Sequence, residues 1–217
     1  MNQNPLSSVQ NRPMPKLFFL VGLPGSGKTF FAEKFSEEYQ IPFINLNKWR
    51  FFMFGEPNFS REEDAQLTRY GADILREIFK TKQSILLEGN LYSRVDRHRY
   101  AQLARQYGYQ PVVIWVQNVD AESKLRAIRL NRNHPKDFLM TPEVFEDLKR
   151  RFTPPNEMEK PIAISGKHSF KMQYRSVLQR IAGDSKPTTE RSLPMAERKA
   201  TNNADASSPK RRLRIFG

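Results

Sequence analysis

Residues 22–29 constrain the possible folds of this chain more than any other segment, and they read Gly-Leu-Pro-Gly-Ser-Gly-Lys-Thr. The segment matches the pattern G-x-x-x-x-G-K-[ST], whose glycines let the backbone curl so that successive N–H groups point at phosphate oxygens. An apolar run, Leu17–Val21, precedes it, and apolar residues spaced four apart (Phe31, Phe35, Tyr39) follow it. A buried strand before the loop and a helix over 28–39 after it are the context that the pattern requires. The segment therefore predicts a phosphate-binding loop.

Each position of this loop has an expected role in binding ATP. Lys28 is expected to reach the β- and γ-phosphates, and the Thr29 hydroxyl is expected to ligate Mg²⁺. The backbone of the loop and the start of the following helix would hold the phosphates, which assigns nucleotide binding to Gly22, Leu23, Pro24, Gly25, Ser26, Gly27, Lys28 and Thr29. ATP and Mg²⁺ are the expected ligands, and the choice between ATP and GTP stays open.

Strand and helix patterns alternate along the rest of the chain. Short apolar runs predict further strands at 41–46, 84–87, 111–116 and 161–164, and helical patterns lie at 60–80, 95–107, 120–131, from 141, and at 169–181. Ser60 and Glu63 have the spacing of a capping box at the start of the second helix. Such alternation predicts an α/β P-loop NTPase fold: a five-stranded, mostly parallel sheet with helices on both faces.

Length and composition set the domain organisation. The 217 residues predict one domain at 16–182, after a flexible leader at 1–15 and before a disordered basic tail at 183–217. The absence of cysteine excludes a disulfide scaffold and a thiolate metal site. We find no apolar run of membrane-spanning length, so a soluble cytoplasmic protein without a membrane span is expected.

The net charge of +13 suggests a polyanionic partner. From Asp184 onward, eight lysines and arginines face four acids, so part of the excess belongs to the tail. The run at 210–214 would let the tail contact an anionic partner such as nucleic acid or an acidic membrane surface; the alternative is a solvated end. A nucleotide site and a solvated surface account for the remaining charge.

Beyond the loop, the order of parts over about 16–182 resembles the P-loop kinase-like family of polynucleotide kinases, zeta-toxin-like kinases and proteins described as AAA family ATPases. The segment Asn47-Lys48-Trp49-Arg50 corresponds to the family's D-x-x-R pattern after the second strand. The resemblance implies that Arg50 binds the phosphate acceptor and that Asn47 stands at the position of the catalytic base. Because an amide is not a useful base near neutral pH, the usual route of proton abstraction is missing.

Glu88-Gly89-Asn90, at the end of the third predicted strand, corresponds to the family's D-x-[TS]-N pattern. By this resemblance Asn90 and the later Arg97 belong to the acceptor site. Glu88 would act on Mg²⁺, orient a water molecule or replace the missing base. A strand-end carboxylate bonded to a neighbouring loop is the structural alternative.

Three arginines at spacings of three, Arg126, Arg129 and Arg132, follow the fourth predicted strand. In the resembled kinases, arginines here belong to a short lid that clamps the transferring phosphate. The resemblance therefore implies catalytic roles for Arg126 and Arg129, with Lys28 and Glu88, and nucleotide binding for Arg132. An ordinary basic helix face is the alternative.

Three functions are consistent with these patterns. The first is a Mg²⁺-dependent phosphotransferase that moves the γ-phosphate of ATP to a hydroxyl of an unidentified acceptor, either a small molecule or a nucleic-acid end. The second is an ATPase or nucleotide-dependent switch without an acceptor, which Asn47 favours. The third is a nucleic-acid-binding protein whose loop senses nucleotide.

Overall fold

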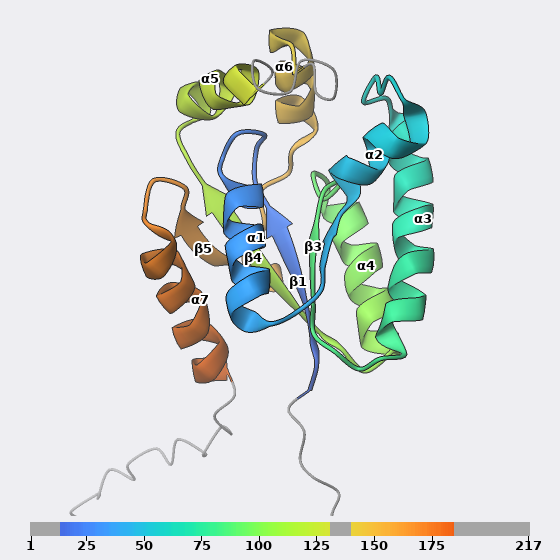
Figure 1. Cartoon of the computed structure of the whole chain (residues 1–217), viewed down its shortest axis with the longest axis vertical. Coiled ribbons are helices and arrows are strands. Elements are labelled where there is room, and N and C mark those ends of the chain that lie inside the picture. Colours follow the sequence, from blue (N-terminus) through green and yellow to red (C-terminus); the bar gives the residue numbers. More distant parts are fainter. Residues whose placement is uncertain (1–13, 131–139, 185–217) are drawn as a thin grey trace, which may run out of the picture. The chain divides into compact units, whose positions relative to one another are not determined.

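The computed structural model describes residues 14–130 and 140–184, so Arg132 and most of the predicted leader and tail lie outside the described residues. Gly183 and Asp184, expected in the disordered tail, belong instead to the last helix. The described chain alternates strands and helices, ending in α7 (Figure 1). No helix in these two ranges is long and apolar enough to cross a membrane.

The five strands form one sheet in the order β2-β3-β1-β4-β5, and every neighbouring pair is parallel. Their bounds are β1 Lys16–Val21, β2 Phe43–Asn45, β3 Ile85–Glu88, β4 Gln110–Gln117 and β5 Ile162–Ser165. The central strand β1 is buried along its whole length, as its continuous apolar sequence predicts. The α/β fold with a five-stranded parallel sheet is confirmed.

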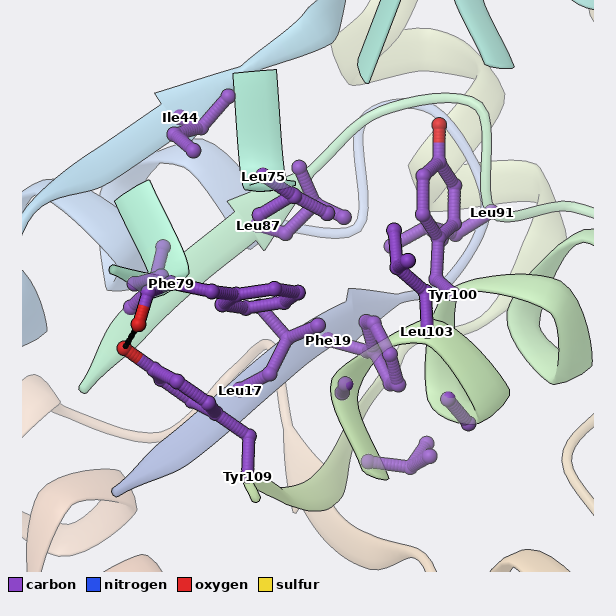
Figure 2. Packing of buried hydrophobic residues seen from close by; sticks show 14 of the residues in the cluster. Leu17, Phe19, Ile44, Leu75, Phe79, Leu87, Leu91, Tyr100, Leu103 and Tyr109 are labelled. Atoms are coloured by element: carbon purple, nitrogen blue, oxygen red, sulfur yellow. Dashed lines mark hydrogen bonds between the residues drawn. The ribbon is translucent and has the colours of Figure 1, made fainter. Parts of the chain in front are cut away.

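Helices cover both faces of the sheet. On one face lie α1 (Lys28–Tyr39) and α7 (Phe170–Asp184); on the other lie α3 (Arg61–Phe79) and α4 (Arg94–Gln106) (Figure 1). Alternate residues of β1 serve the two cores: Phe18 packs with the α1–α7 side, and Leu17 and Phe19 pack with the α3–α4 side. Figure 2 shows the second core, where Leu17 and Phe19 lie near Phe79.

The sequence patterns missed helix α2 (Leu46–Phe54). The expected strand at 41–46 is shorter because the Asn45 side chain caps the helix, accepting hydrogen bonds from the backbone N–H groups of Asn47 and Lys48 at 3.0 and 3.1 Å. Asn47 and Arg50 thus lie on a helix that begins directly at the sheet edge.

Two further helices, α5 (Asp120–Leu130) and α6 (Pro142–Arg151), lie beyond the carboxyl ends of the strands (Figure 1). Their apolar side chains form a third buried cluster with Phe59, and Leu23 of the glycine-rich loop packs against it. The cluster consists of Phe59, Ala127, Met140, Phe145 and Leu148. The helices on either side of the predicted lid segment therefore pack against the loop itself.

Candidate nucleotide-binding and acceptor site

The glycine-rich loop connects β1 to α1 and lies against α5. Gly25 and Gly27 adopt left-handed backbone angles, with φ of 74° and 101°. A Cβ atom on Gly25 would lie 2.1 Å from the Ser123 carbonyl oxygen of α5, so no larger residue fits. Close packing and backbone angle together explain the glycine at this position.

Lys28, Thr29 and Glu88 meet at the carboxyl end of the central strands. The Thr29 hydroxyl donates a hydrogen bond to Glu88 Oε1 at 2.8 Å, and Glu88 Oε2 lies 3.4 Å from Asn45 Nδ2. Glu88 ends β3, which neighbours β1, and its side chain is buried. The structure thus brings together both predicted metal-binding residues, Thr29 and Glu88. Hydroxyl and carboxylate oxygens suit Mg²⁺, which is usually held by few protein ligands plus substrate phosphates.

Burial changes the proton affinities of Lys28 and Glu88. It raises the pKa of the Glu88 carboxyl group, while the Lys28 ammonium and the Thr29 hydrogen bond oppose the rise. Burial lowers the pKa of Lys28, and the Glu88 carboxylate opposes that fall. Lys28 Nζ donates to the Leu23 carbonyl oxygen at 2.8 Å, so its ammonium group lies across the phosphate-binding loop.

Asn47 and Lys28 line the same small cavity. Together with Gly89 and Asn90 they line a narrow cavity of about 10 Å³, close to the volume one water molecule needs. A Cβ atom on Gly89 would lie 2.8 Å from the Asn47 backbone nitrogen, which keeps the two segments in close contact. The amide of Asn47 and the ammonium group of Lys28 therefore share one small cavity.

Arg50 is not placed to bind an acceptor. Its side chain is fully buried; it donates to Glu63 Oε2 at 2.7 Å and forms a second ion pair with Asp64. Its guanidinium group also lies 4.9 Å from the centre of the Phe59 ring. The assignment of Arg50 to acceptor contact is corrected: a buried guanidinium needs carboxylate partners, and these pairs hold α2 against α3.

The capping box predicted at Ser60 forms only in half. Ser60 Oγ accepts a hydrogen bond from the Glu63 backbone N–H at 3.2 Å. The Glu63 carboxylate does not return the contact, because it accepts from Arg50 and from the backbone N–H groups of Asn58 and Phe59 at 2.8 and 2.9 Å. The Arg50 ion pair has replaced the second half of the cap.

Arg97 is likewise a structural residue in this conformation. It is buried, and it donates to the two carboxylate oxygens of Glu159 at 2.7 and 3.0 Å. It also donates to the carbonyl oxygens of Leu91 and Tyr92 at 3.0 and 3.3 Å. The expected acceptor contact is corrected here too: Arg97 fixes the loop between β3 and α4.

Asn90 ties the same loop to α3. It has a left-handed backbone (φ 51°), and its Nδ2 donates to the Asp64 carbonyl oxygen at 2.7 Å and to Thr68 Oγ1 at 2.8 Å. Asn90 also lines a polar cavity of about 390 Å³ between α3, α4 and α6, whose other walls include Asp64, Thr68, Tyr92, Asp96 and Arg151. Of the four residues predicted for the acceptor site, Asn47 and Asn90 reach a cavity near the glycine-rich loop.

Asp64, Tyr92 and Arg151 are cavity residues that the sequence patterns did not identify. Asp64 pairs with Arg50 of α2 and, at 2.6 Å, with Arg151 of α6. Burial raises the pKa of the Asp64 carboxyl group, with the two arginines opposing the rise, and burial raises the pKa of Tyr92 to about 12. These residues come from three separate elements, and no local motif connects them.

One of the two described arginines predicted for the lid, Arg126, lies near the glycine-rich loop. Arg126 is exposed, and its Nη1 lies 3.4 Å from the Gly166 carbonyl oxygen. Gly166 borders the loop so closely that a Cβ atom there would lie 2.1 Å from the Ser26 carbonyl oxygen. Arg129 is exposed on the same helix.

A third cavity, of about 460 Å³, opens beside the loop at the carboxyl ends of β4 and β5. Its lining includes Leu23, Ser26, Asp120, Ser165 and Lys167. Lys167 also pairs with Glu122 of α5 at 2.7 Å, which links the two segments that flank the cavity. In open α/β sheets, ligands bind in the crevice outside the carboxyl ends of the strands.

Several solved structures share this fold. The structure of a gluconokinase from Sinorhizobium meliloti matches with 15% identity and a TM-score of 0.60 over 80% of this chain and 97% of that one. A putative kinase from Chloroflexus aurantiacus matches with 18% identity and a TM-score of 0.63 over 78% and 97%. The APS kinase of Mycobacterium tuberculosis, solved with AMPPNP and APS, matches with 15% identity and a TM-score of 0.58 over 78% and 99%.

Comparison with curated protein sequences gives no match. A sequence model of an AAA domain matches residues 17–155, which include the glycine-rich loop, β3 and both helices of the α5–α6 pair. The chain therefore belongs to this AAA domain family, and it has the fold of P-loop kinases.

Proposed function

We propose that the protein is a Mg²⁺-dependent phosphotransferase that moves the γ-phosphate of ATP to a hydroxyl group of an acceptor. The observation that carries this proposal is the assembly of Lys28, Thr29 and Glu88 at the glycine-rich loop, together with a separate polar cavity beyond Asn90. A hydrolase needs only the first of these features, whereas a transferase needs both.

On the nucleotide side, the loop backbone and Lys28 would bind the phosphates of ATP, and Thr29 and Glu88 would hold Mg²⁺. The ion would neutralise charge on the phosphate oxygens. Lys28 would leave the Leu23 carbonyl oxygen and bind the β- and γ-phosphates. Arg126, at the edge of the loop, would add positive charge near the transferring phosphoryl group, with Arg129 and Arg132 as further candidates.

On the acceptor side, the cavity lined by Asp64, Thr68, Asn90 and Asp96 would bind the acceptor. Carboxylate, hydroxyl and amide side chains suit a ligand with several hydroxyl groups, because they offer both hydrogen-bond donors and acceptors. Arg50, Arg97 and Arg151 would act as positioning residues: they hold Asp64 and the Tyr92 backbone rather than the ligand.

The second candidate is ATP hydrolysis or a nucleotide-dependent switch without an acceptor. The observation that favours it is the amide of Asn47 beside Lys28, in a cavity that offers no side-chain carboxylate among the described residues. In that case Glu88 would orient the attacking water, and the polar cavity would have no catalytic role.

The deciding experiment measures two products from γ-labelled ATP. The full-length protein is incubated with Mg²⁺ and a panel of acceptors, including polyols, sugars, nucleosides and oligonucleotides with free 5′ ends, and labelled acceptor and free phosphate are both quantified. Labelled acceptor supports the phosphotransferase. Phosphate release that no acceptor changes supports the hydrolase, and the absence of both products contradicts the two proposals.

One cavity variant and a control variant outside the cavity make the same assay specific. Thr68→Val removes a hydroxyl from the polar cavity and should lower acceptor transfer while leaving acceptor-independent phosphate release unchanged. Ser176→Val, on the exposed face of α7, is the matched control and should change neither product. Equal transfer by both variants would remove the cavity from the proposed acceptor site.

A further inference from the structure

A fourth cavity, of about 480 Å³, lies away from the glycine-rich loop, between α4, the sheet and the short 3-10 helix η1 (Glu157–Glu159). Its lining includes Gln110 and Pro111, at the amino end of β4, whereas the loop lies at the carboxyl end of β1. We call this cavity the α4 groove. It shares none of its lining residues with the three cavities described above.

Basic side chains line the α4 groove. Arg94, His98 and Arg105, at spacings of four and seven, lie on one face of α4, and Lys160 lines the groove from the segment after η1. Glu159 is the one carboxylate among the described lining residues; Arg97 binds both of its oxygens, and Arg94 Nε lies 3.9 Å from one of them. The groove therefore carries a local excess of positive charge.

The remaining lining is largely apolar. It includes Ala101 of α4, Pro111 and Val113 of β4, and Met158 of η1. Met158 is 90% exposed, so its side chain is accessible to a ligand in the groove. The volume lies in the range of small-molecule sites. Positive charge beside an apolar wall suits a ligand that is both anionic and apolar.

Charge argues against occupants that are themselves basic. A second copy of the chain would bring a net charge of +13, and the segment from residue 184 onward carries eight cationic residues against four acids. Either occupant would add positive charge to a positive surface. The complementary ligand must carry negative charge.

We infer that the α4 groove is a binding site for an amphipathic organic anion. Its carboxylate, sulfonate or phosphate would meet Arg94, Arg105 and Lys160, and its apolar body would lie against Ala101, Val113 and Met158. This inference does not depend on the proposed phosphotransfer, because the groove is separate from the glycine-rich loop and is tested by binding alone.

The test uses 8-anilinonaphthalene-1-sulfonate, a fluorescent anion with an apolar body, titrated into the full-length protein. The double variant Arg105→Glu, Lys160→Glu reverses charge on both sides of the groove and should weaken binding about tenfold or more, because opposite charges become like charges. The matched control Lys171→Glu, Arg175→Glu reverses two exposed charges of α7 and should leave the affinity unchanged. Lys28→Ala should also leave it unchanged.

Two further measurements protect the test against a variant that fails to fold. Met158→Ser alters an exposed side chain and should weaken binding severalfold with an unchanged melting temperature. The neutral probe N-phenyl-1-naphthylamine should bind at least about tenfold more weakly than the sulfonate if charge contributes to recognition. Equal affinity of both charge-reversed proteins, equal binding of the neutral probe, or loss of binding in Lys28→Ala would overturn the inference.

Discussion

The nucleotide side and the acceptor side of the candidate site use basic residues differently. At the loop, Lys28 lies beside a single carboxylate and bonds to a backbone carbonyl, which a phosphate can replace. On the acceptor side, Arg50 and Arg97 are each bound to carboxylates and are fully buried. The first arrangement leaves a cation available to a ligand, and the second uses the cation to hold the fold together.

The difference follows from the cost of burying charge. A buried guanidinium is tolerated when carboxylates and carbonyl oxygens satisfy its donors, and removing one partner leaves the other charged and unpaired. Arg50, Asp64 and Arg151 form such a network between α2, α3 and α6. An arginine at a motif position is therefore not by itself evidence of a ligand contact.

Removal of Lys28 should have the largest effect on activity. Lys28→Ala is expected to lower turnover about 1000-fold, because it removes the charge that faces the transferring phosphoryl group. Lys34→Ala, on the exposed face of the same helix, should leave turnover unchanged. The measurement is initial-rate kinetics with labelled ATP. Turnover retained in Lys28→Ala would contradict the assignment of Lys28 to the ATP-binding site.

Removal of Arg50 should act on stability first. Arg50→Met leaves Glu63 and Asp64 without their buried partner and is expected to lower the free energy of unfolding by about 3 kcal/mol. Arg76→Met, which breaks an exposed pair with Asp73, should change it by about 0.5 kcal/mol or less. Urea unfolding followed by circular dichroism measures both. Unchanged stability together with a raised KM for the acceptor would instead indicate that Arg50 contacts the acceptor.

Replacement of Asn47 probes the missing base. Asn47→Asp places a carboxylate beside Lys28 and should raise acceptor transfer about tenfold, since a positioned base accelerates proton transfer. Asn47→Ala removes the amide without adding a base and should show no such rise. If the two variants behave alike, Glu88 or the geometry of the acceptor limits the reaction.

The pH dependence of ATP affinity should show the smallest effect. The pKa of Lys28 lies below its usual value, so the ammonium loses its proton at a lower pH than an ordinary lysine does. ATP affinity should therefore fall severalfold as the pH rises from neutral toward the ordinary lysine pKa of about 10.4, while Lys28→Ala should show little change. Calorimetric titration measures both, and parallel slopes would show that another group titrates.

Much of the fold could be predicted because its signals are local. The apolar run before Gly22, the helical spacing after Lys28 and the alternation of elements predicted the parallel sheet and the phosphate-binding loop. Helix α2 was missed because Asn45 is both the last residue of β2 and the cap of the helix, so the apolar run continues across the boundary.

The sequence by itself determined the phosphate-binding loop and its neighbouring strand and helix, because backbone angles and hydrogen-bonding groups there depend on adjacent residues. Only the tertiary structure decided what Arg50, Arg97 and Asn90 do. Their partners, such as Glu159 for Arg97, lie up to 62 positions away in the chain. Whether a charged side chain meets a ligand or a buried carboxylate depends on which distant residues the fold places beside it.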